Sequence, residues 1–345
     1  MARVPETKLS SQQAAAIDTA VKAQMEKQGF IGVAVGILQN NEIVYLQGYG
    51  LADQAKKLPV TTQTIFNWAS NSKPVCSVLA MQLAEQRKLD LNVDIRQYLP
   101  EFPAKSGTIT MRHLLCHQSG IQHYGRPIPT SRQYNTPMPH MDPVLALDVF
   151  NQSPLLHTPG SKELYSSYAY VVASAVIHKA GGESYATQLQ KRIVKPLNLT
   201  SLQYDVPFDN QPHWATGYIK VAGVVTPAKE EAHYWKHGAG GFKSNIVDFA
   251  RWAQGLLQHK LVSNTTEQAM WTRQQTSDGK TARYGLGFVI DDQGGLRVSH
   301  SGKQDEATSR LVIYPRSGSG VVVMTNCGFG DPAAISTAIF ATLRD

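Results

Sequence analysis

The chain has 345 residues, of which 42% are hydrophobic and 17% are charged, a globular composition that excludes extensive disorder. Its formal net charge is +7 at pH 7, but the lysines and arginines are scattered and no basic run is interleaved with aromatic residues. Nucleic acid is therefore not an expected partner. No stretch is apolar over the length that a membrane-spanning helix needs, so no membrane span is expected.

Cysteine and histidine spacing gives no sign of a metal site. Cys76, Cys116 and Cys327 lie far apart in apolar stretches, and their odd number argues against a disulfide framework and against a zinc site. His123 and His140 lack metal-ligand spacing and are predicted to be surface residues. We therefore expect no metal and no other cofactor.

The first predicted element is a helix that Ser10 or Ser11 caps and that runs to about Lys27. Residues 31–38 and 43–50 are rich in strand-forming residues and flank a polar turn, which predicts a β-hairpin. No charged-then-apolar leader precedes them. The start is either natural or was placed before a mature exported chain, and a periplasmic location is favoured over a cytoplasmic one.

Residues 66–74, with the sequence Phe-Asn-Trp-Ala-Ser-Asn-Ser-Lys-Pro, lead into an apolar helix. Pro74 lacks an N–H and is restricted to the first turn of that helix, which therefore begins near Ser70 or Asn71. Ser70 and Lys73 share one face of this turn because they are three residues apart. A hydroxyl beside an amine is the arrangement that a serine nucleophile with a lysine base requires.

The pattern S-x-x-K alone is weak evidence of catalysis. Ser277 and Lys280 repeat it in a polar turn that no helix follows. The Ser70 helix differs because Val75, Leu79 and Leu83 recur at i+4 spacing, which predicts a buried stripe.

The middle of the chain is predicted to be helical. Thr110 caps a short helix that stops at Ser119-Gly120. Residues 121–142 contain four prolines without periodicity, so we expect a long loop that is functional or mobile and can wall a site. Further helices are predicted over residues 164–180, 185–194 and 246–257, the last with Asn245 and Asp248 in a capping box.

The last part of the chain is rich in strands, predicted over residues 284–291, 296–300, 309–314 and 320–325, before a helix over 332–343. This pattern predicts an α+β fold. One antiparallel sheet is assembled from the two chain ends and flanked by the terminal helices, and an all-helical lobe is inserted. A single domain would cover residues 10–345, with a sheet lobe at about 10–66 and 260–345 and a helical lobe at about 67–259. Ser70 would lie near their seam, where clefts usually form.

Two further motifs carry possible chemistry. Tyr165 is expected at the head of a helix, and a tyrosine is a usable base where an ammonium favours its phenolate, although any one of 14 tyrosines is more often structural. His300-Ser301-Gly302 follows a predicted strand and in isolation reads as a strand end. Gly302 would let a substrate approach the strand edge, and the N–H of Lys303 would complete an oxyanion hole with that of Ser70.

Together and in this order, the three motifs resemble the serine β-lactamase and penicillin-binding-protein superfamily, whose signatures are S-x-x-K, Y-x-N and K-T-G or H-x-G. The resemblance is closest to the class C branch and to the related esterases and D-amino-acid peptidases. Residues 110–120 resemble the family segment T-x-R-H-L-L-x-H-x-S-G, residues 240–248 its G-G-hydrophobic-x-S element, and residues 320–326 its last strand. The resemblance covers about residues 31–326 and implies a β-lactamase/transpeptidase-like fold.

The resemblance also implies roles for the site residues. Ser70 would be acylated and Lys73 would help to deprotonate it. Tyr165 would relay protons to the leaving group and then activate the deacylating water. The N–H groups of Ser70 and Lys303 would hold the oxyanion, and Ser167, Ser301 and Gly302 would bind substrate.

The chain departs from the family pattern at two positions. Ser167 stands in place of the Y-x-N asparagine, which in β-lactamases binds the acyl-amide side chain, so recognition of β-lactams and of D-Ala-D-Ala is in doubt. His300 stands where many class C enzymes have lysine, as in the esterase and D-aminopeptidase branches. We expect His300 to polarise Tyr165 with a charge that depends on pH.

The leading hypothesis is a serine hydrolase that acts through a Ser70 acyl-enzyme on esters or small amides, with esterase activity foremost. The alternatives are a β-lactamase or a peptidoglycan DD-peptidase or D-aminopeptidase, and a non-catalytic binding or scaffold protein. Retention of Ser70, Lys73 and Tyr165 together argues against the last. The expected partner is a small-molecule ester, amide or β-lactam, and the sequence does not indicate the oligomeric state.

Overall fold

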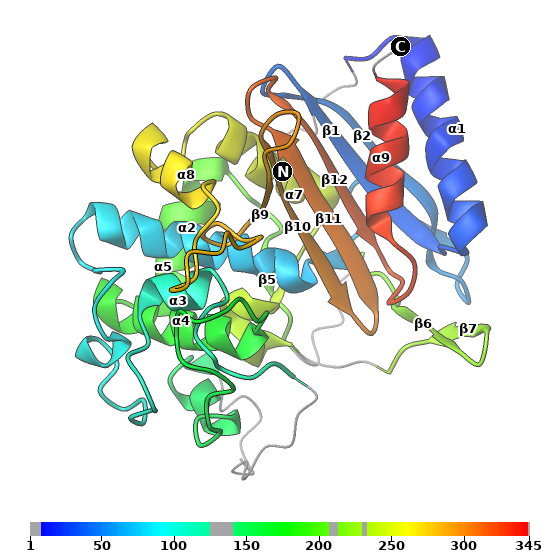
Figure 1. Cartoon of the computed structure of the whole chain (residues 1–345). Helices are drawn as coiled ribbons and strands as arrows, with labels where there is room; N and C mark the ends of the chain where they lie inside the picture. Colours follow the sequence, from blue (N-terminus) through cyan, green and yellow to red (C-terminus); the bar gives the residue numbers. More distant parts are fainter. Residues whose placement is uncertain (1–7, 125–140, 207–212, 230–232, 344–345) are drawn as a thin grey trace.

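The computed structural model describes residues 8–124, 141–206, 213–229 and 233–343. Its centre is a seven-stranded antiparallel sheet in the order β3-β2-β1-β12-β11-β10-β9. Strand β1 (Gly32–Gln39) pairs with β12 (Ser319–Thr325), so the N-terminal hairpin joins the C-terminal strands directly (Figure 1). The prediction of an α+β fold with one sheet built from both chain ends is confirmed.

The remaining strands complete the large sheet or form two smaller ones. The large sheet also contains β2 (Glu42–Asp53), β3 (Leu58–Pro59), β9 (Val289–Asp291), β10 (Arg297–Gln304) and β11 (Ala307–Tyr314). A three-stranded sheet consists of β4 (Phe66–Asn67), β8 (Phe242–Ser244) and β5 (Gln203–Tyr204), and a separate hairpin of β6 (Tyr218–Val221) and β7 (Val224–Pro227).

The predicted strand over residues 284–291 is mostly absent, since only β9 at its end forms. Gly287 has a φ of +91°, and a Cβ there would lie 2.1 Å from Ser77 Oγ. The chain therefore turns tightly against the central helix before β9 begins, in a conformation that glycine adopts without strain.

The terminal helices cover one face of the sheet (Figure 1). Helix α1 (Ser11–Gln28) begins at a Ser10 capping box, as the sequence predicts, and packs against α9 (Pro332–Thr342). Alternate residues of β1 point to these helices and bury an apolar cluster that includes Val33, Val35 and Ile37. This burial fixes which face of the hairpin meets the terminal helices.

Helix α7 (Ile246–Leu257) covers the opposite face, although the sequence placed it within the helical lobe. A Cβ at Gly36 of β1 would lie 2.8 Å from the Val322 side chain and 3.1 Å from Ala250 Cβ of α7. Glycine at this position therefore permits close approach of helix and sheet. The Asn245 side chain caps α7 as expected, but the Asp248 carboxylate accepts from the backbone N–H groups of Ser201 and Leu202 instead of completing a capping box.

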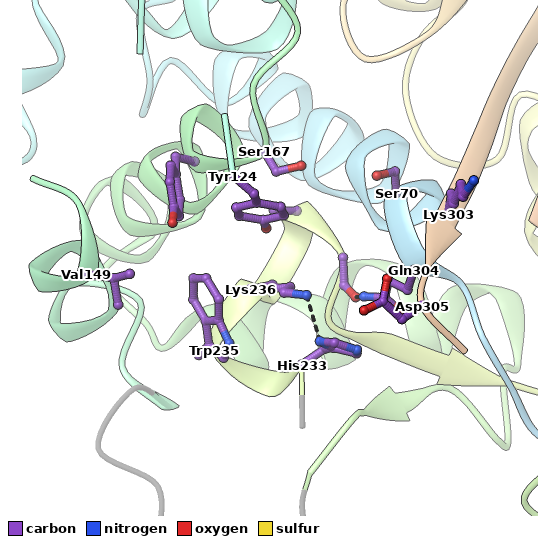
Figure 2. A pocket seen from close by; sticks show the side chains of 13 residues that line it. Ser70, Tyr124, Val149, Ser167, His233, Trp235, Lys236, Lys303, Gln304 and Asp305 are labelled. Atoms are coloured by element: carbon purple, nitrogen blue, oxygen red, sulfur yellow. Dashed lines mark hydrogen bonds between the residues drawn. The ribbon is translucent and has the colours of Figure 1, made fainter. Parts of the chain in front are cut away.

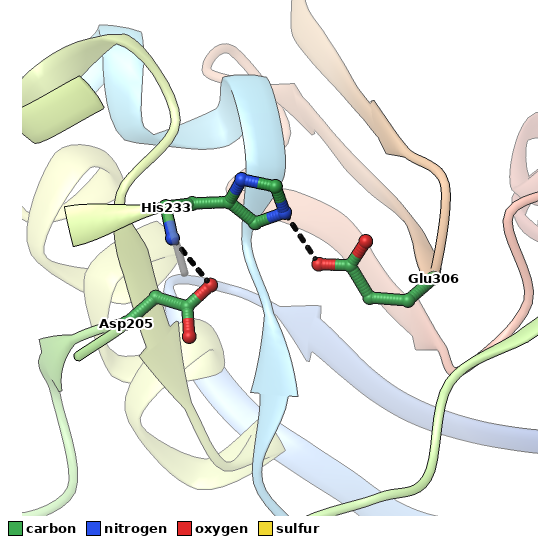
Figure 3. Close-up of side chains that lie close together, drawn as sticks. All are labelled: Asp205, His233 and Glu306. Atoms are coloured by element: carbon green, nitrogen blue, oxygen red, sulfur yellow. Dashed lines mark hydrogen bonds and ion pairs between the residues drawn. The ribbon is translucent and has the colours of Figure 1, made fainter. Parts of the chain in front are cut away.

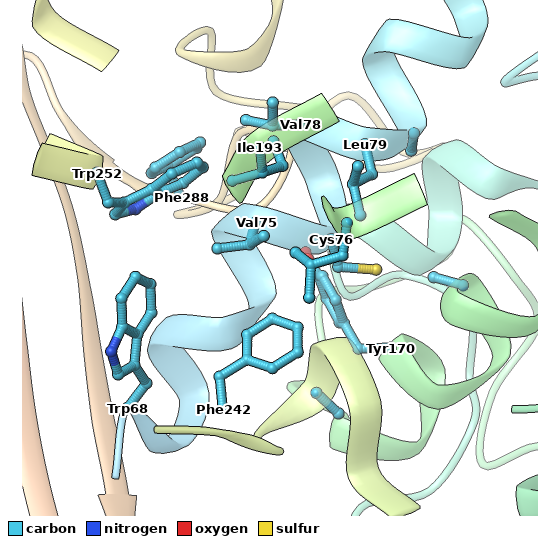
Figure 4. Packing of buried hydrophobic residues seen from close by; sticks show 14 of the residues in the cluster. Trp68, Val75, Cys76, Val78, Leu79, Tyr170, Ile193, Phe242, Trp252 and Phe288 are labelled. Carbon is cyan, nitrogen blue, oxygen red and sulfur yellow. The ribbon is translucent and has the colours of Figure 1, made fainter. Parts of the chain in front are cut away.

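The central helix α2 (Ser72–Glu85) follows a 3₁₀ turn, η1 (Ala69–Asn71). The sequence predicts one apolar stripe, but the helix is buried on every side from Ser72 to Met81. It lies among the aromatic side chains of the main core, including Trp68, Phe242 and Tyr170 (Figure 4). Cys76 lies in this core as a small buried residue, as expected, and all three cysteines are free and buried.

The remaining helices complete the described part of the chain. They are α3 (Met111–Leu115), α4 (Ser167–Gly181), α5 (Tyr185–Leu189), α6 (Lys195–Leu197), α8 (Asn264–Met270), the 3₁₀ segments η2 (Ile95–Gln97), η4 (Leu145–Val149) and η6 (Tyr234–Ala239), and the π-helical segment η5 (Gln190–Val194). Within the described ranges, no helix combines the length and apolarity needed to cross a bilayer. Residues 125–140, which include His140 and most of the predicted long loop, lie outside the described residues.

Gly36 provides a test of the close contact between α7 and the sheet. We expect Gly36→Val to lower the free energy of unfolding by about 1–3 kcal/mol, because the added methyl groups overpack a site with no space. The measurement is urea denaturation followed by circular dichroism. Gln47→Val, an exposed position on β2, introduces the same side chain without overpacking and is expected to change stability by no more than about 0.5 kcal/mol. Equal stability of the two variants would contradict this account.

Candidate active site

Ser70 lies in the 3₁₀ turn η1, immediately before helix α2. The preceding residue, Ala69, has a φ of +48°, a conformation that residues with a side chain rarely adopt. The surrounding structure holds this strained turn, since the Trp68 N–H donates to the Phe242 carbonyl oxygen at 2.8 Å. Backbone strain of this kind concentrates at functional sites.

Asn71 connects η1, the candidate nucleophile turn that contains Ser70, to strand β10. Its amide lies 3.2 Å from the His300 carbonyl oxygen and 3.2 Å from the Gly302 nitrogen, in the orientation in which it donates to the first and accepts from the second. It also bonds to Ser309 Oγ at 2.8 Å. These contacts keep β10 beside Ser70. The sequence analysis missed them because neither the S-x-x-K motif nor the His300-Ser301-Gly302 motif assigns a role to Asn71.

Gly302 has a different role from the one that the sequence suggests. A Cβ at this position would lie 2.3 Å from the Trp68 carbonyl oxygen and 2.3 Å from Ser309 Oγ. The space beside Gly302 is thus filled by the protein itself rather than by substrate. The glycine allows β10 to approach the nucleophile turn.

Lys73 contacts Ser70 from the buried side. Its Nζ lies 2.9 Å from Ser70 Oγ, 3.0 Å from Ser167 Oγ and 2.6 Å from the Ala239 carbonyl oxygen. Burial, and then the positive charge of Lys236, lower the pKa of Lys73 well below its ordinary value. The amine is therefore available in its neutral form, whose lone pair can take the Ser70 proton.

Tyr165 contacts Ser70 from another side, with its hydroxyl 2.8 Å from Ser70 Oγ. It lies just before α4, because Ser166 is the cap and accepts from the Ala169 N–H. Burial, and then Tyr284, raise the pKa of Tyr165, although the hydrogen bond to Ser70 opposes this. The resting side chain is therefore a neutral phenol, which is a proton donor. The sequence analysis considered a phenolate that acts as a base, and the raised pKa disfavours that form in the resting site.

His300 is not the pH-dependent cation expected from the sequence. Its imidazole is buried, and burial followed by the charge of Lys73 lowers its pKa to about 3. Its Nδ1 lies 2.8 Å from the Ser301 carbonyl oxygen, and its ring centroid lies 6.5 Å from that of Tyr165. His300 is therefore neutral near pH 7 and contacts Tyr165 as a ring rather than polarising it as a charge.

Two more histidines support the head of α4. The ring of His117 lies 4.3 Å from that of Tyr165, and its Nδ1 accepts from the Ser166 N–H at 3.2 Å. His117 belongs to the segment that resembles the family, but sequence analysis gave it no role. His123, predicted to lie on the surface, is instead half-buried and accepts from the Ser167 N–H at 3.1 Å. Burial, and then the charges of Lys73 and Lys236, lower the pKa of His123 to about 4.

A cavity of about 460 Å³ opens beside Ser70 (Figure 2). Its walls include Ser167 and Lys303, two of the predicted binding residues. Ser301 does not line this cavity, and its Oγ accepts from Arg310 Nη1 at 2.9 Å. The other lining residues are Tyr124, Val149, Tyr168, His233, Trp235, Lys236, Ala239, Gly240, Gln304 and Asp305.

Asp205, His233 and Glu306 carry potential metal-ligand atoms within 4.8 Å of one another (Figure 3). Each of them already has a partner. Lys243 Nζ lies 2.6 Å from Asp205 Oδ1, His233 Nε2 lies 2.8 Å from Glu306 Oε1, and Lys236 Nζ lies 2.6 Å from His233 Nδ1. A metal ion would compete with two ammonium groups, so this cluster is best described as an ion-pair network.

Comparison with known proteins identifies the family. Residues 17–344 match the family model described as Beta-lactamase. The chain belongs to the Beta-lactamase family. The resemblance that the motifs indicate is thereby confirmed.

The individual proteins that this chain resembles share less than a third of its sequence. The putative penicillin-binding protein PbpX of Bacillus subtilis (strain 168) is 29% identical over 267 residues, which cover 77% of this chain and 63% of PbpX. The structure of EstCE1, a hydrolase with promiscuous acyltransferase activity, has a TM-score of 0.79 at 22% identity and covers 95% of this chain and 98% of its own. The D-amino acid amidase of Ochrobactrum anthropi SV3 has a TM-score of 0.80 at 20% identity, covering 96% and 100%.

At these identities, the structural likenesses establish a shared β-lactamase/transpeptidase fold. The chain spans 62% to 64% of the length of several curated relatives, PbpX among them. Within the family fold, Ser70, Lys73 and Tyr165 meet as the motif order predicts.

The depressed pKa of Lys73 leads to a prediction about pH. If the neutral amine is the base, kcat/KM is expected to fall as pH falls through the lowered pKa of Lys73 and to be level above it. A pH profile with p-nitrophenyl butyrate measures this. An inflection near the ordinary lysine pKa of about 10.4 would contradict the assignment.

The identity of the base is tested by Lys73→Arg. Arginine stays charged near neutral pH, so we expect kcat/KM to fall by about a hundredfold or more. Lys280→Arg, in the exposed second S-x-x-K pattern, is the matched control and should match the wild type. Retention of more than about a tenth of the wild-type rate in Lys73→Arg would mean that another group is the base.

Proposed function

We propose that the chain is a serine hydrolase that acts through a Ser70 acyl-enzyme on esters or small amides, with esterase activity foremost. The observation that carries this proposal is the pair of contacts at Ser70 Oγ, 2.9 Å to Lys73 Nζ and 2.8 Å to the Tyr165 hydroxyl. One group is a base with a lowered pKa and the other is a neutral proton donor. The base can deprotonate a nucleophile that lies between such a pair, and the proton donor can protonate the leaving group of the substrate.

Acylation begins when neutral Lys73 takes the Ser70 proton and Oγ attacks the substrate carbonyl carbon. The N–H groups of Ser70 and Lys303 hold the oxyanion, since β10 lies beside the nucleophile turn. Tyr165 then protonates the leaving group as its bond to the acyl carbon breaks. The resulting phenolate is stabilised by the Lys73 ammonium, whose Nζ lies 5.0 Å from the ring centroid.

Deacylation reverses these proton movements. The Tyr165 phenolate takes a proton from water, and the hydroxide attacks the acyl carbon. When the intermediate collapses, Ser70 Oγ leaves and receives the proton from the Lys73 ammonium. The acid product departs, and all three groups return to their starting protonation states.

The serine at position 167 favours simple esters over β-lactams as substrates. Its Oγ lies 3.0 Å from Lys73 Nζ, so its short side chain is directed to the catalytic amine. A hydroxyl cannot offer the carbonyl acceptor and NH₂ donor that an asparagine presents to an acylamino group. A simple ester needs neither of these groups. The alternative is a β-lactamase, DD-peptidase or D-aminopeptidase activity, which would use the same serine, lysine and tyrosine chemistry.

Covalent labelling tests whether Ser70 is the nucleophile. We expect an activated ester or fluorophosphonate to add one adduct to the wild type, seen by intact-mass spectrometry, and none to Ser70→Ala. The substitution removes one oxygen and should preserve the fold. Ser277→Ala, in the second S-x-x-K pattern, should still be labelled once. An adduct on Ser70→Ala would refute the assignment, and an unlabelled wild type would favour the binding or scaffold alternative.

Substrate choice is tested at Ser167. A substrate whose acylamino group lacks the hydrogen bonds of an asparagine would lose about 1–3 kcal/mol, which corresponds to roughly a ten- to a hundredfold lower rate of reaction. We therefore expect kcat/KM for p-nitrophenyl butyrate to exceed that for nitrocefin, and Ser167→Asn to raise the nitrocefin rate relative to the ester rate. If the wild type already prefers nitrocefin by orders of magnitude, the β-lactamase alternative replaces the esterase proposal.

A further inference from the structure

The cavity beside Ser70 has one wall made of aromatic rings. Tyr124, Tyr168 and Trp235 all line it, and Val149 adds an aliphatic side chain. The ring centroids of Tyr124 and Tyr168 lie 4.8 Å apart at an interplanar angle of 84°, and the Trp235 centroid lies 6.1 Å from the first and 6.4 Å from the second. Figure 2 shows Tyr124 and Trp235 between Ser70 and Val149. We call these three rings the aromatic corner of the cavity.

Two rings of the aromatic corner are carried by segments that also contact the buried Lys73 amine. Tyr168 directly follows Ser167 at the start of α4, and Trp235 belongs to η6, which also contains Ala239. Ser167 Oγ lies 3.0 Å and the Ala239 carbonyl oxygen 2.6 Å from Lys73 Nζ. The same contacts that fix Lys73 therefore fix the position of these rings relative to it.

The third ring, Tyr124, is positioned by its neighbour His123. Their rings stack with centroids 4.8 Å apart at an interplanar angle of 29°. His123 in turn accepts from the Ser167 N–H at 3.1 Å, and its ring meets that of Tyr165 edge-on at a centroid distance of 5.2 Å. The aromatic corner is thus tied to the reacting groups at all three rings and is formed before a substrate arrives.

Polar side chains line other parts of the cavity, among them Lys303, Gln304 and Asp305. The Lys236 ammonium contacts His233 Nδ1 at 2.6 Å, and it lies 5.2 Å from the Tyr124 ring centroid and 5.8 Å from that of Trp235. An ammonium at this distance attracts an aromatic ring, so Lys236 helps to hold these two rings in place. The apolar part of a substrate gains most from the aromatic corner, where it leaves water for a surface of rings.

The part of the substrate that enters this cavity is the acyl group. Under the proposed function, Tyr165 protonates the leaving group, which must depart on the side of its hydroxyl. Ser70 lines the cavity and Tyr165 does not, so the leaving group departs elsewhere. A volume of about 460 Å³ is within the usual range for small-molecule sites and accommodates a short arm that ends in a ring.

We propose that the aromatic corner of Tyr124, Tyr168 and Trp235 binds an aryl ring at the end of the acyl chain. The preferred substrates are then esters or small amides of arylalkanoic acids, in which a short methylene arm joins the ring to the carbonyl carbon. Aromatic rings attract one another in offset and edge-to-face arrangements, and a saturated ring of similar size lacks this attraction. Trp235, which is half-buried, is a specificity-determining residue. This inference rests on the proposed hydrolase function and adds the class of acyl group to it.

The test compares pairs of p-nitrophenyl esters that differ only in the ring: the phenylacetate, 3-phenylpropanoate and 4-phenylbutanoate, each with its cyclohexyl counterpart. At the arm length whose phenyl ester reacts fastest, we expect the wild type to favour the phenyl ester in kcat/KM by about tenfold. Trp235→Leu keeps an apolar side chain without a ring and should reduce this ratio to less than about threefold, mainly through KM, because the contact is remote from the scissile bond. Trp235→Phe keeps a ring and should retain most of the preference.

Trp214→Leu is the matched control. Trp214 is also a half-buried tryptophan beside a lysine, with Lys243 Nζ 3.8 Å from its ring centroid, but it does not line the cavity. We expect this variant to keep the wild-type ratio. An equal loss of the phenyl preference in both leucine variants would show a general effect of losing a tryptophan and would overturn the inference. An unchanged ratio in Trp235→Leu, or a wild-type ratio near one, would overturn it too.

Failure of this inference is distinguishable from failure of the proposed function. If both esters of a pair acylate Ser70 but the phenyl preference is absent, the hydrolase proposal stands and the aryl site is wrong. If no ester acylates Ser70, the hydrolase proposal itself is wrong. Should the Trp235 variants fail to fold, product inhibition of the wild type decides the matter. The phenyl acid should compete with its ester about tenfold more strongly than the cyclohexyl acid does, and equal inhibition would overturn the inference.

Discussion

The buried amine of Lys73 is the group on which the arrangement of the site depends. Its three oxygen partners come from different parts of the chain: Ser70 from η1, Ser167 from the first residue of α4, and Ala239 from η6. An ammonium enclosed by protein loses its hydration, so the neutral form is favoured. The same core that encloses α2 therefore supplies both the geometry and the basicity that a serine nucleophile needs.

The histidines around this amine follow the same logic. His117, His123 and His300 all lie near Lys73 or Tyr165, and burial is the largest cause that lowers the pKa of each. Neutral imidazoles accept backbone hydrogen bonds and pack on the tyrosine without adding charge. The lysines that line the cavity beside Ser70 are Lys236 and Lys303.

The pairing of the two chain ends brings the motifs together. Strand β10 follows Ser70 by more than two hundred residues but reaches it because β1 pairs with β12 in the same sheet. Asn71 and Gly302 then fix the last few ångströms, one by hydrogen bonds and the other by the absence of a side chain. If the oxyanion is held by two N–H groups, its geometry depends on this local contact and not on the strand sequence alone.

The sequence by itself determined the helices, the hairpin and the order of the catalytic motifs. Capping residues such as Ser10 and Thr110, and the restriction on Pro74, are local signals that act within one turn of the chain. The meeting of Ser70, Lys73 and Tyr165 was also predictable, because a family pattern carries that tertiary information in its residue order.

Only the tertiary structure decided how these groups are charged and what surrounds them. The neutrality of His300, the carbonyl of Ala239 beside Lys73 and the lysine held by His233 all arise from burial and from contacts between distant segments. The burial of α2 on every side likewise depends on elements that pack around it. Desolvation depends on the packing of the whole core, and no spacing of residues along the chain encodes it locally.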